Sequence, residues 1–404
     1  MRGLRLAALR FPTIALAVAL LPAVPATLGQ TKPEVKPELP QPRRLGRGVE
    51  LRRDPVTGEL RTLPAKSAKP RSADEASAPR LPPATIRARV GLVEVSCNVF
   101  GPDGVPLRGL GRDDFRLFED GVQQSIAHFD ESSEPASIAL LIDASPSVFR
   151  EWDEMKVAAR ALVEKFSPRD AVAVVAFAGG AHLLLPFSRD RVLLERAMVS
   201  RELARVADSR ESNIYQAVYL TVRELFRGPA PRRGRKAIIL LTDGQDSGLG
   251  LSWDPASAAP QPGERSSRLT FEDVVRELAA AGVEVYAVST QARPKAMTDV
   301  WLEAHRSELL VTPAARELGM PHYTLYLAEL VRRSSGRLYF LREIGTLSEV
   351  YRRIAETLGA QYTLGYYPTT GLGKPGWHAL RVELAGHDKT RLTHRAAYYV
   401  PAAP

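Results

Sequence analysis

From residue 137 onward the chain alternates continuous apolar strands with amphipathic helices, and this pattern restricts the fold more than any other feature. Four apolar runs carry it, at 137–143, 171–177, 236–241 and 283–288. Between them, segments such as 271–281 repeat their apolar residues at helical spacing. Strands that are apolar on both faces belong in a mostly parallel sheet covered by helices on each side. The sequence therefore predicts a doubly wound α/β domain, which we place at residues 134–360.

Segments of strand character flank this unit on both sides. Before it, apolar residues from Val93 to Val99 alternate with polar ones, which is the period of a half-buried strand. After it, three short runs have strand character, at 361–368, 378–386 and 394–400. Each flank supplies too few strands to be stable alone. We therefore predict that residues 86–133 and 361–404 join in one small antiparallel β-sandwich, with the α/β domain inserted between them.

The first 26 residues have the features of a secretory signal peptide. Three arginines precede an apolar stretch from Phe11 to Ala26 that ends in small residues. This stretch contains three prolines and is shorter than the roughly 20 residues that a spanning helix needs. The sequence predicts cleavage after Ala26, a secreted, periplasmic or cell-envelope location, and no integral membrane span after cleavage. A retained N-terminal anchor is the alternative.

Residues 27–85 are rich in proline and mixed charge and poor in aromatic residues. Such a composition buries too little apolar surface to offset the ordering entropy, so it predicts a disordered linker. The net charge of +9 is also concentrated near the N-terminus, because residues 1–85 carry 15 Lys and Arg against 7 Asp and Glu. The remaining chain is close to neutral, which argues against a nucleic-acid partner. A single cysteine, Cys97, excludes an internal disulfide framework.

Polar residues with oxygen side chains follow two of the apolar strands. Asp143, Ser145 and Ser147 come after the first strand, and a strand period that persists through the turn directs them to one side. Asp243 follows a later strand. The carboxyl ends of parallel strands are where ligands bind in such sheets, and hard oxygens suit Mg²⁺ or Mn²⁺. An ordinary turn in which Ser147 caps the next helix is the alternative.

This combination resembles the metal-ion-dependent adhesion site of von Willebrand factor type A domains. More narrowly, it is similar to a bacterial VWFA-related family that has short β segments on both sides of the domain. The motifs D-x-S-x-S at 143–147 and T-D-G at 242–244 carry the likeness, which extends over roughly residues 88–400.

The resemblance implies a metal site that holds Mg²⁺ or Mn²⁺. Its ligands would be Asp143, Ser145, Ser147, Ser212 and Asp243. Ser212 stands where the family has a threonine, and serine keeps the oxygen. Arg210 and Glu211 stand where the family has glycines. Their side chains would narrow the loop that carries Ser212 or add charges beside the metal.

In the adhesion sites that the sequence resembles, an acidic side chain of a partner completes the metal shell. We therefore expect a secreted, non-catalytic protein that binds a protein partner through the metal. The expected rim of that site consists of Arg210, Glu211, Gln245 and Asp246. One alternative is a metal-independent structural module of the cell envelope. The other, a metal-dependent hydrolase, is disfavoured because the sequence has no G-x-S-x-G motif, no P-loop and no close histidine pair.

Overall fold

The computed structural model describes the chain from residue 38 to residue 401, with gaps. The described residues are 38–47, 49–53, 60–64, 92–131, 135–146, 148, 164–206, 211–228, 234–249, 269–304, 321–344, 346–369, 374–386 and 390–401. The predicted signal peptide at 1–26 lies outside them. No helix within these ranges is long and apolar enough to cross a membrane.

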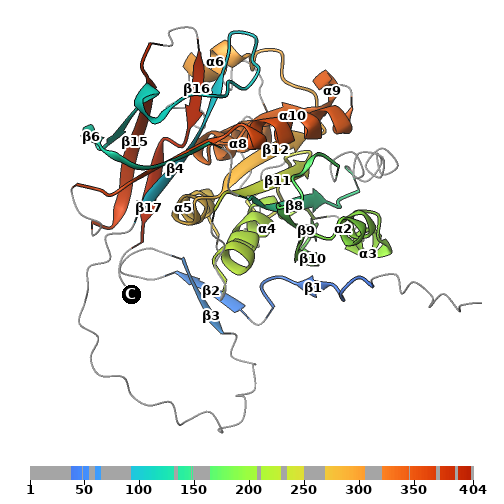
Figure 1. Cartoon of the computed structure of the whole chain (residues 1–404). Helices are drawn as coiled ribbons and strands as arrows, with labels where there is room; N and C mark the ends of the chain where they lie inside the picture. The colour runs from blue at the N-terminus through green and yellow to red at the C-terminus, as the bar shows by residue number, and fades with distance from the viewer. Residues whose placement is uncertain are drawn as a thin grey trace, which may run out of the picture. The chain divides into compact units, whose positions relative to one another are not determined.

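Seven strands of the described chain form a central sheet in the order β1-β10-β9-β8-β11-β12-β13 (Figure 1). Their bounds are β1 (Arg43–Arg44), β8 (Ser137–Asp143), β9 (Ala171–Phe177), β10 (Ala181–Ser188), β11 (Lys236–Thr242), β12 (Glu284–Ser289) and β13 (Leu338–Phe340). Five neighbouring strands run parallel, namely β9, β8, β11, β12 and β13, while β10 and β1 are antiparallel to their neighbours. Every residue of β8, β9 and β12 is buried. The predicted doubly wound, mostly parallel sheet is confirmed.

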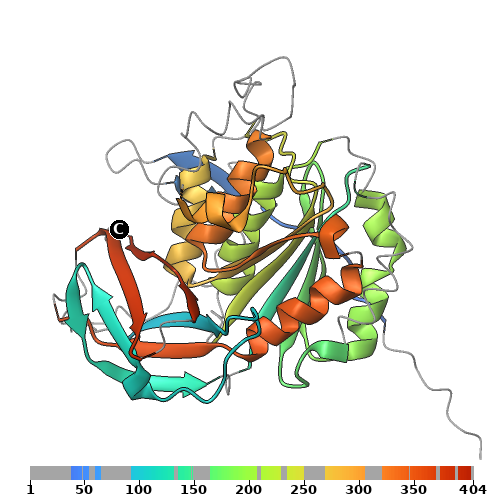
Figure 2. The ribbon, with the colours of Figure 1, turned by 90° about the horizontal axis from the view of Figure 1, so that it is seen from above.

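Helices cover both faces of this sheet (Figure 2). One face is covered by α2 (Arg191–Met198), α3 (Arg201–Val206) and α10 (Leu347–Gly359). The other is covered by α4 (Ile214–Thr221), its π-helical continuation η3 (Val222–Phe226), α5 (Phe271–Ala281) and α8 (His322–Arg333). The short helices α6 (Asp299–Ala304) and α9 (Leu341–Ile344) lie in connections.

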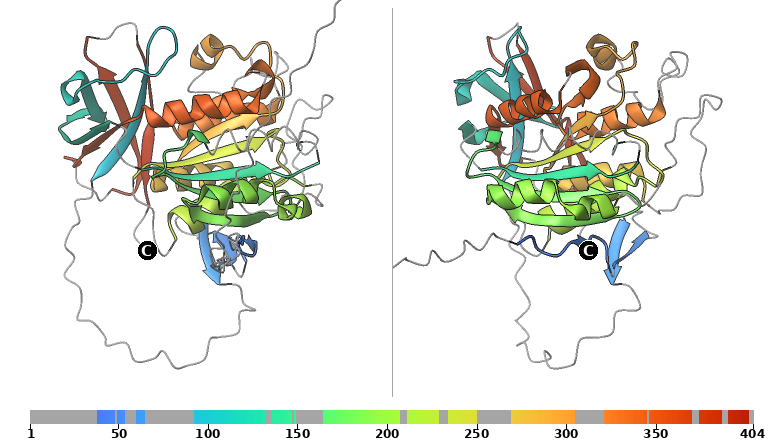
Figure 3. Two further views of the ribbon diagram at one scale, coloured as in Figure 1. Left: turned by 45° about the vertical axis from the view of Figure 1, so that its right-hand side comes forward. Right: turned by 90° about the vertical axis from the view of Figure 1, so that its right-hand side faces the viewer.

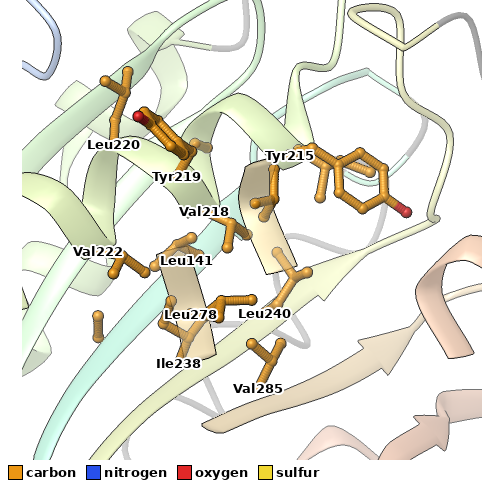
Figure 4. Close-up of a cluster of buried hydrophobic side chains, with 14 of the residues drawn as sticks. Leu141, Tyr215, Val218, Tyr219, Leu220, Val222, Ile238, Leu240, Leu278 and Val285 are labelled. Carbon is orange, nitrogen blue, oxygen red and sulfur yellow. The ribbon is translucent and has the colours of Figure 1, made fainter. Parts of the chain in front are cut away.

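Alternate residues of the strands supply two separate cores, as the strand period requires. In β8, Leu140 belongs to the core under α10, whereas Leu141 belongs to the core under α4. Figure 4 shows the second core, where Leu141 and Leu240 of the sheet face Val218 of α4. Asp143 has the same parity as Leu141, so its side chain is directed to the α4 side of the sheet.

Two four-stranded antiparallel sheets lie beside the α/β part within the described chain, in the orders β16-β4-β14-β7 and β17-β15-β5-β6. Their strands are β4 (Val93–Phe100), β5 (Phe115–Glu119), β6 (Val122–Gln124), β7 (Ile126–Glu131), β14 (Tyr362–Tyr366), β15 (Gly376–Leu384), β16 (Arg391–His394) and β17 (Ala397–Val400), with the turn η1 (Arg112–Asp114) before β5. Strands from before and after the α/β part pair directly in both sheets, as β4 does with β14 and β5 with β15 (Figure 3). Val95 and Cys97 of one sheet and Leu117 and Val382 of the other share a single core. The prediction of an α/β unit inserted in a small sandwich is confirmed.

The predicted disordered linker is wrong for the described residues between 38 and 64. β1 pairs with β10 at the edge of the central sheet, and β2 (Val49–Arg53) pairs with β3 (Leu60–Pro64). Leu45 is only 3% exposed and packs with the core under α4. Low apolar content does not prevent ordering here, because these residues bury their few apolar side chains against a surface that the folded domain already provides, not against each other.

An ion pair fixes this N-terminal strap, which we define as residues 38–64, to α5. Arg53 donates two hydrogen bonds to Asp273, at 3.1 and 2.6 Å, and Asp273 also accepts from the backbone N–H of Thr270 at 2.9 Å. Asp273 thereby joins the strap to the first turn of the helix. Although burial opposes it, hydrogen bonding by Arg53 and Thr270 holds the pKa of Asp273 below its ordinary value.

This lowered pKa predicts how stability depends on pH. A carboxyl whose folded pKa is depressed stabilises the fold above its unfolded pKa, and the contribution is lost as the pH falls through the folded pKa. We expect Asp273→Asn to lower the free energy of unfolding by about 2 kcal/mol at pH 7 and by much less at pH 3. Urea unfolding of the two proteins at both pH values measures this. A difference that is the same at pH 7 and pH 3 would contradict the account, and the exposed Asp113→Asn serves as control.

Candidate metal centre

The buried carboxylate of Asp143 is the centre of the site. Asp143 is the last residue of β8 and is 1% exposed. Its Oδ1 accepts the backbone N–H of Ser145 at 2.9 Å, and its Oδ2 accepts the hydroxyls of Thr242 at 2.7 Å and Ser212 at 3.1 Å. Three chain segments that are far apart in sequence therefore meet on one carboxylate.

Strand register explains why Thr242 reaches Asp143. β11 and β8 are parallel and in register, with Leu241 opposite Ile142, so Thr242 continues the ladder opposite Asp143. Side chains at paired positions of neighbouring strands point to the same face. Thr242 was not among the predicted ligands, although the T-D-G motif contains it.

Asp243 follows directly and is 2% exposed. Its carboxylate accepts the backbone N–H of Gln245 at 3.0 Å and the side-chain amide of Gln245 at 3.2 Å. Gly244 has φ of +90°, and a Cβ there would lie 3.2 Å from the Tyr323 ring. The turn that presents Asp243 therefore requires glycine.

Ser212 is held in place by the loop that follows β11. Its backbone N–H donates to the Ser247 hydroxyl at 3.2 Å, and its carbonyl accepts the Ser247 N–H at 2.7 Å. On the other side, the N–H of Asn213 donates to Ala178 O at 2.9 Å, at the end of β9. These contacts place the Ser212 hydroxyl at Asp143, with the exposed Glu211 next to it in the chain.

The sequence predicts Asp246 on the exposed rim of the site, but this prediction is wrong, because Asp246 is only 2% exposed. Its two carboxylate oxygens accept the backbone N–H groups of Tyr215 at 3.2 Å and Leu249 at 2.6 Å. Asp246 thus ties its loop to the first turn of α4. A carboxylate at that position also interacts favourably with the helix dipole.

Of the other predicted site residues, Ser145 is 4% exposed and touches Asp143, as given above. Glu211 is exposed and Gln245 half-buried. Ser147 and Arg210 lie outside the described residues. The structure therefore brings Ser145, Ser212 and the two carboxyl groups to one edge of the sheet.

The site collects negative charge that no described cation neutralises. Burial raises the pKa of Asp143 to about 6, partly offset by hydrogen bonds from Thr242 and Ser145, and the charge of Asp243 raises it further. Burial likewise raises the pKa of Asp246 to about 6, with a contribution from Asp143. Neither Asp143 nor Asp243 forms an ion pair with a described Lys, Arg or His. Buried carboxylates without a counter-charge are costly, and a bound cation removes that cost.

The donor atoms fit a hard divalent cation. The described part of the chain has no group of three or more His, Cys, Asp or Glu side chains placed to hold a metal. The donors at this edge are instead two carboxylates with the hydroxyls of Ser145 and Ser212 beside them. All are oxygen ligands of the kind that Mg²⁺ and Mn²⁺ prefer, and none is a soft ligand for zinc or copper.

Thr242 offers a test of this hydrogen-bond network with a matched control. We expect Thr242→Val to lower the free energy of unfolding in EDTA by about 1.5 kcal/mol, because a buried carboxylate loses a donor. Thr221 is also buried, but its hydroxyl makes no hydrogen bond to the described residues. Thr221→Val should therefore be neutral or slightly stabilising. Equal losses for both variants in urea unfolding would contradict the network.

Comparison with known proteins gives a family for the α/β part. The family model described as the von Willebrand factor type A domain matches residues 137–306. A search of curated proteins gives no match.

Solved structures that are similar to this chain include three that we describe in turn. Proximal thread matrix protein 1 from the mussel byssus, with a zinc-occupied MIDAS motif, is 16% identical with a TM-score of 0.35, and the alignment covers 61% of this chain and 49% of that one. The vWF domain of the pilus tip protein Mfa5 from Porphyromonas gingivalis is 12% identical (TM-score 0.36; 55% and 95% covered). A von Willebrand factor type A protein from Catenulispora acidiphila is 12% identical (TM-score 0.35; 76% and 74% covered). This chain thus spans about half the length of the mussel protein.

The matched residues begin at Ser137, the first residue of β8, and include β9, β11 and β12 as well as the segments that carry Asp143, Ser212 and Asp243. The match therefore covers the parallel strands at the centre of the sheet together with the candidate metal centre. The chain contains a von Willebrand factor type A domain.

Proposed function

We propose that this chain is a secreted or cell-envelope protein whose von Willebrand factor type A domain binds a protein partner through a divalent cation, without catalysis. The ion would be Mg²⁺ or Mn²⁺, held by Asp143, Ser145, Ser147, Ser212 and Asp243. The observation that carries the proposal is the pair of buried aspartates at the ends of β8 and β11. Asp143 accepts hydrogen bonds from two hydroxyls, and neither carboxylate forms an ion pair with a described cation. The signal peptide expected at 1–26 supports the location.

The charge balance explains the kind of partner. Two carboxylates neutralise most of the charge of a divalent cation. The bound metal keeps a coordination position that water fills, and one more anionic oxygen can bind there. An acidic side chain of a partner protein meets this requirement. Glu211 is exposed and Gln245 half-buried beside the site, so they are the described residues that such a partner would meet first.

A second function is favoured by a specific observation. Asp143 already accepts three hydrogen bonds, from Ser145, Ser212 and Thr242, and this network holds the loops together without a metal. In that case the domain is a metal-independent structural module of the cell envelope. The hydrolase alternative has less support, because the site offers no described histidine to activate a nucleophile at Ser145.

Water-proton relaxation with Mn²⁺ tests both parts of the proposal in one sample. Mn²⁺ added to the full chain should show enhanced relaxation, because the bound ion keeps at least one water. Added acetate, a mimic of the partner's carboxylate, should then lower that enhancement by displacing the water.

Asp243→Asn is the site variant, and it should bind Mn²⁺ at least tenfold more weakly. Asp113→Asn, at an exposed position, is the control and should behave as the wild type. No enhancement in the wild type would favour the structural module. Enhancement that acetate does not change would overturn the carboxylate partner while leaving the metal in place.

A further inference from the structure

A cavity of about 310 Å³ lies where the α/β part meets the sandwich, away from the candidate metal centre. Its walls are the first residues of β11 and β12, the last residues of α5 and α8, and parts of β4 and β17. Lys236 in this wall begins β11, and Thr242 at the far end of that strand contacts Asp143. The cavity is therefore about 20 Å from the metal centre, at the opposite edge of the sheet.

Two cations converge on this cavity. A Cβ placed on Gly282, in the cavity wall, would lie 3.6 Å from Arg395 Nη1 and 4.0 Å from Lys236 Nζ. The Arg395 guanidinium donates to two backbone carbonyls, Ala279 O at 3.4 Å and Glu94 O. Carbonyls carry only partial charges, so these bonds do not neutralise the guanidinium.

Donors in the cavity wall lack acceptors. Arg395 Nε is buried and has no hydrogen-bond partner among the described residues. The Ser335 hydroxyl is in the same state, on a residue that is 8% exposed and has φ of +68°. The Lys236 ammonium makes no hydrogen bond or ion pair with the described residues. Buried donors of this kind normally have a partner, and a strained residue often marks a functional site.

The other charged groups in the wall are already occupied. Arg333 forms a two-bond ion pair with Glu272, and Arg235 donates to Leu358 O. The Glu284 carboxylate accepts from Gln361 at 2.7 Å. Glu284 and Glu94 both act on Arg395 through their charge, and Glu94 also acts on Lys236, but neither carboxylate forms an ion pair with either cation among the described residues.

Burial lowers the pKa of Lys236 and that of Arg395, which is the response of a cation without a close counter-ion. We propose that this cavity binds a small anion through carboxylate or phosphate oxygens, with Lys236, Arg395 and Ser335 as its donors. The volume accommodates an organic acid or phosphate of metabolite size. A ligand there would contact both the sandwich and the α/β part, and so fix their junction.

The test is thermal unfolding of the full chain in EDTA, with sodium phosphate, sodium succinate or sodium chloride at equal ionic strength. We expect at least one of the two oxyanions to raise Tm by about 4 °C over chloride. A shift with phosphate alone or succinate alone identifies the class of ligand. EDTA removes divalent ions, so the outcome is independent of the proposed metal function.

Lys236→Met should lose this shift, whereas Lys295→Met, at an exposed lysine, should keep it. Lys236→Met should also have a higher Tm than the wild type in chloride, because it removes a buried charge that has no partner. If Lys236→Met does not fold, equilibrium dialysis of phosphate or succinate against wild type and Ser335→Ala replaces it, and Ser335→Ala should bind several-fold more weakly. No shift in the wild type with either anion, or an equal shift in Lys236→Met and Lys295→Met, would overturn the proposal.

Discussion

Replacing Gly336 with alanine is expected to lower the free energy of unfolding by about 4 kcal/mol. Gly336 follows α8, and a Cβ on it would overlap the backbone carbonyl of Val285 and lie 3.1 Å from the N–H of Tyr286. Both residues belong to β12, a buried strand that is hydrogen-bonded on each side. A central strand cannot move away as a flexible side chain would, so the sheet itself must distort.

Gly111→Ala is the matched control for this substitution. Gly111 has φ of −93°, and the nearest atom to a Cβ there is a carboxylate oxygen of Asp114 at 3.8 Å. It should change stability by less than about 0.5 kcal/mol. Urea unfolding measures both variants. A Gly336→Ala variant as stable as Gly111→Ala would show that α8 and β12 are not packed as described.

Asp143→Asn is expected to abolish stabilisation by divalent cations. At 100 times the dissociation constant, a bound ion adds about 2.7 kcal/mol to the wild type, and the variant should lose all of it. The amide keeps the shape and one acceptor oxygen, so the variant should still fold in EDTA. The exposed Asp113→Asn should retain the full effect of the metal. An Asp143→Asn protein that Mg²⁺ stabilises as strongly as the wild type would remove Asp143 from the site.

The sequence predicts well those elements whose apolar residues are buried in the core of their own domain, because burial sets the spacing of those residues. The apolar runs that became β8 and β9 are buried over their whole length. The sandwich was predictable because neither flank could be stable alone, and β4 indeed pairs with β14.

The sequence pattern does not predict β10 or α8. β10 contains Pro186, a residue that interrupts strand patterns and is tolerated near a sheet edge. α8 follows Pro321 without a side-chain cap, so its start lacks the Ser, Thr, Asp or Asn that marks most helix N-termini. The composition of the N-terminal strap does not predict its order for another reason. Leu45 is buried against the surface of the already folded α/β part, and composition does not show such a contact.

The sequence predicts those site residues that lie within one short motif. It predicts less well the residues that reach the site only through the packing of distant segments. The motifs placed Asp143 and Asp243 at the same edge of the sheet, and both are buried there. The contact of Ser212 with Asp143 spans 69 residues and depends on the docking of Ser247. The burial of Asp246 follows from its hydrogen bonds to backbone N–H groups, which no spacing rule foretells.

The most direct test of the metal centre is a set of melting curves of the wild-type chain in Mg²⁺, in Mn²⁺ and in EDTA. The buried, uncompensated carboxylates predict that a saturating cation raises Tm by several degrees over EDTA, equivalent to about 2.7 kcal/mol at 100 times the dissociation constant. The rise should follow the cation concentration and disappear on addition of chelator. Identical melting curves with Mg²⁺, with Mn²⁺ and with EDTA would contradict a metal-binding function for this domain.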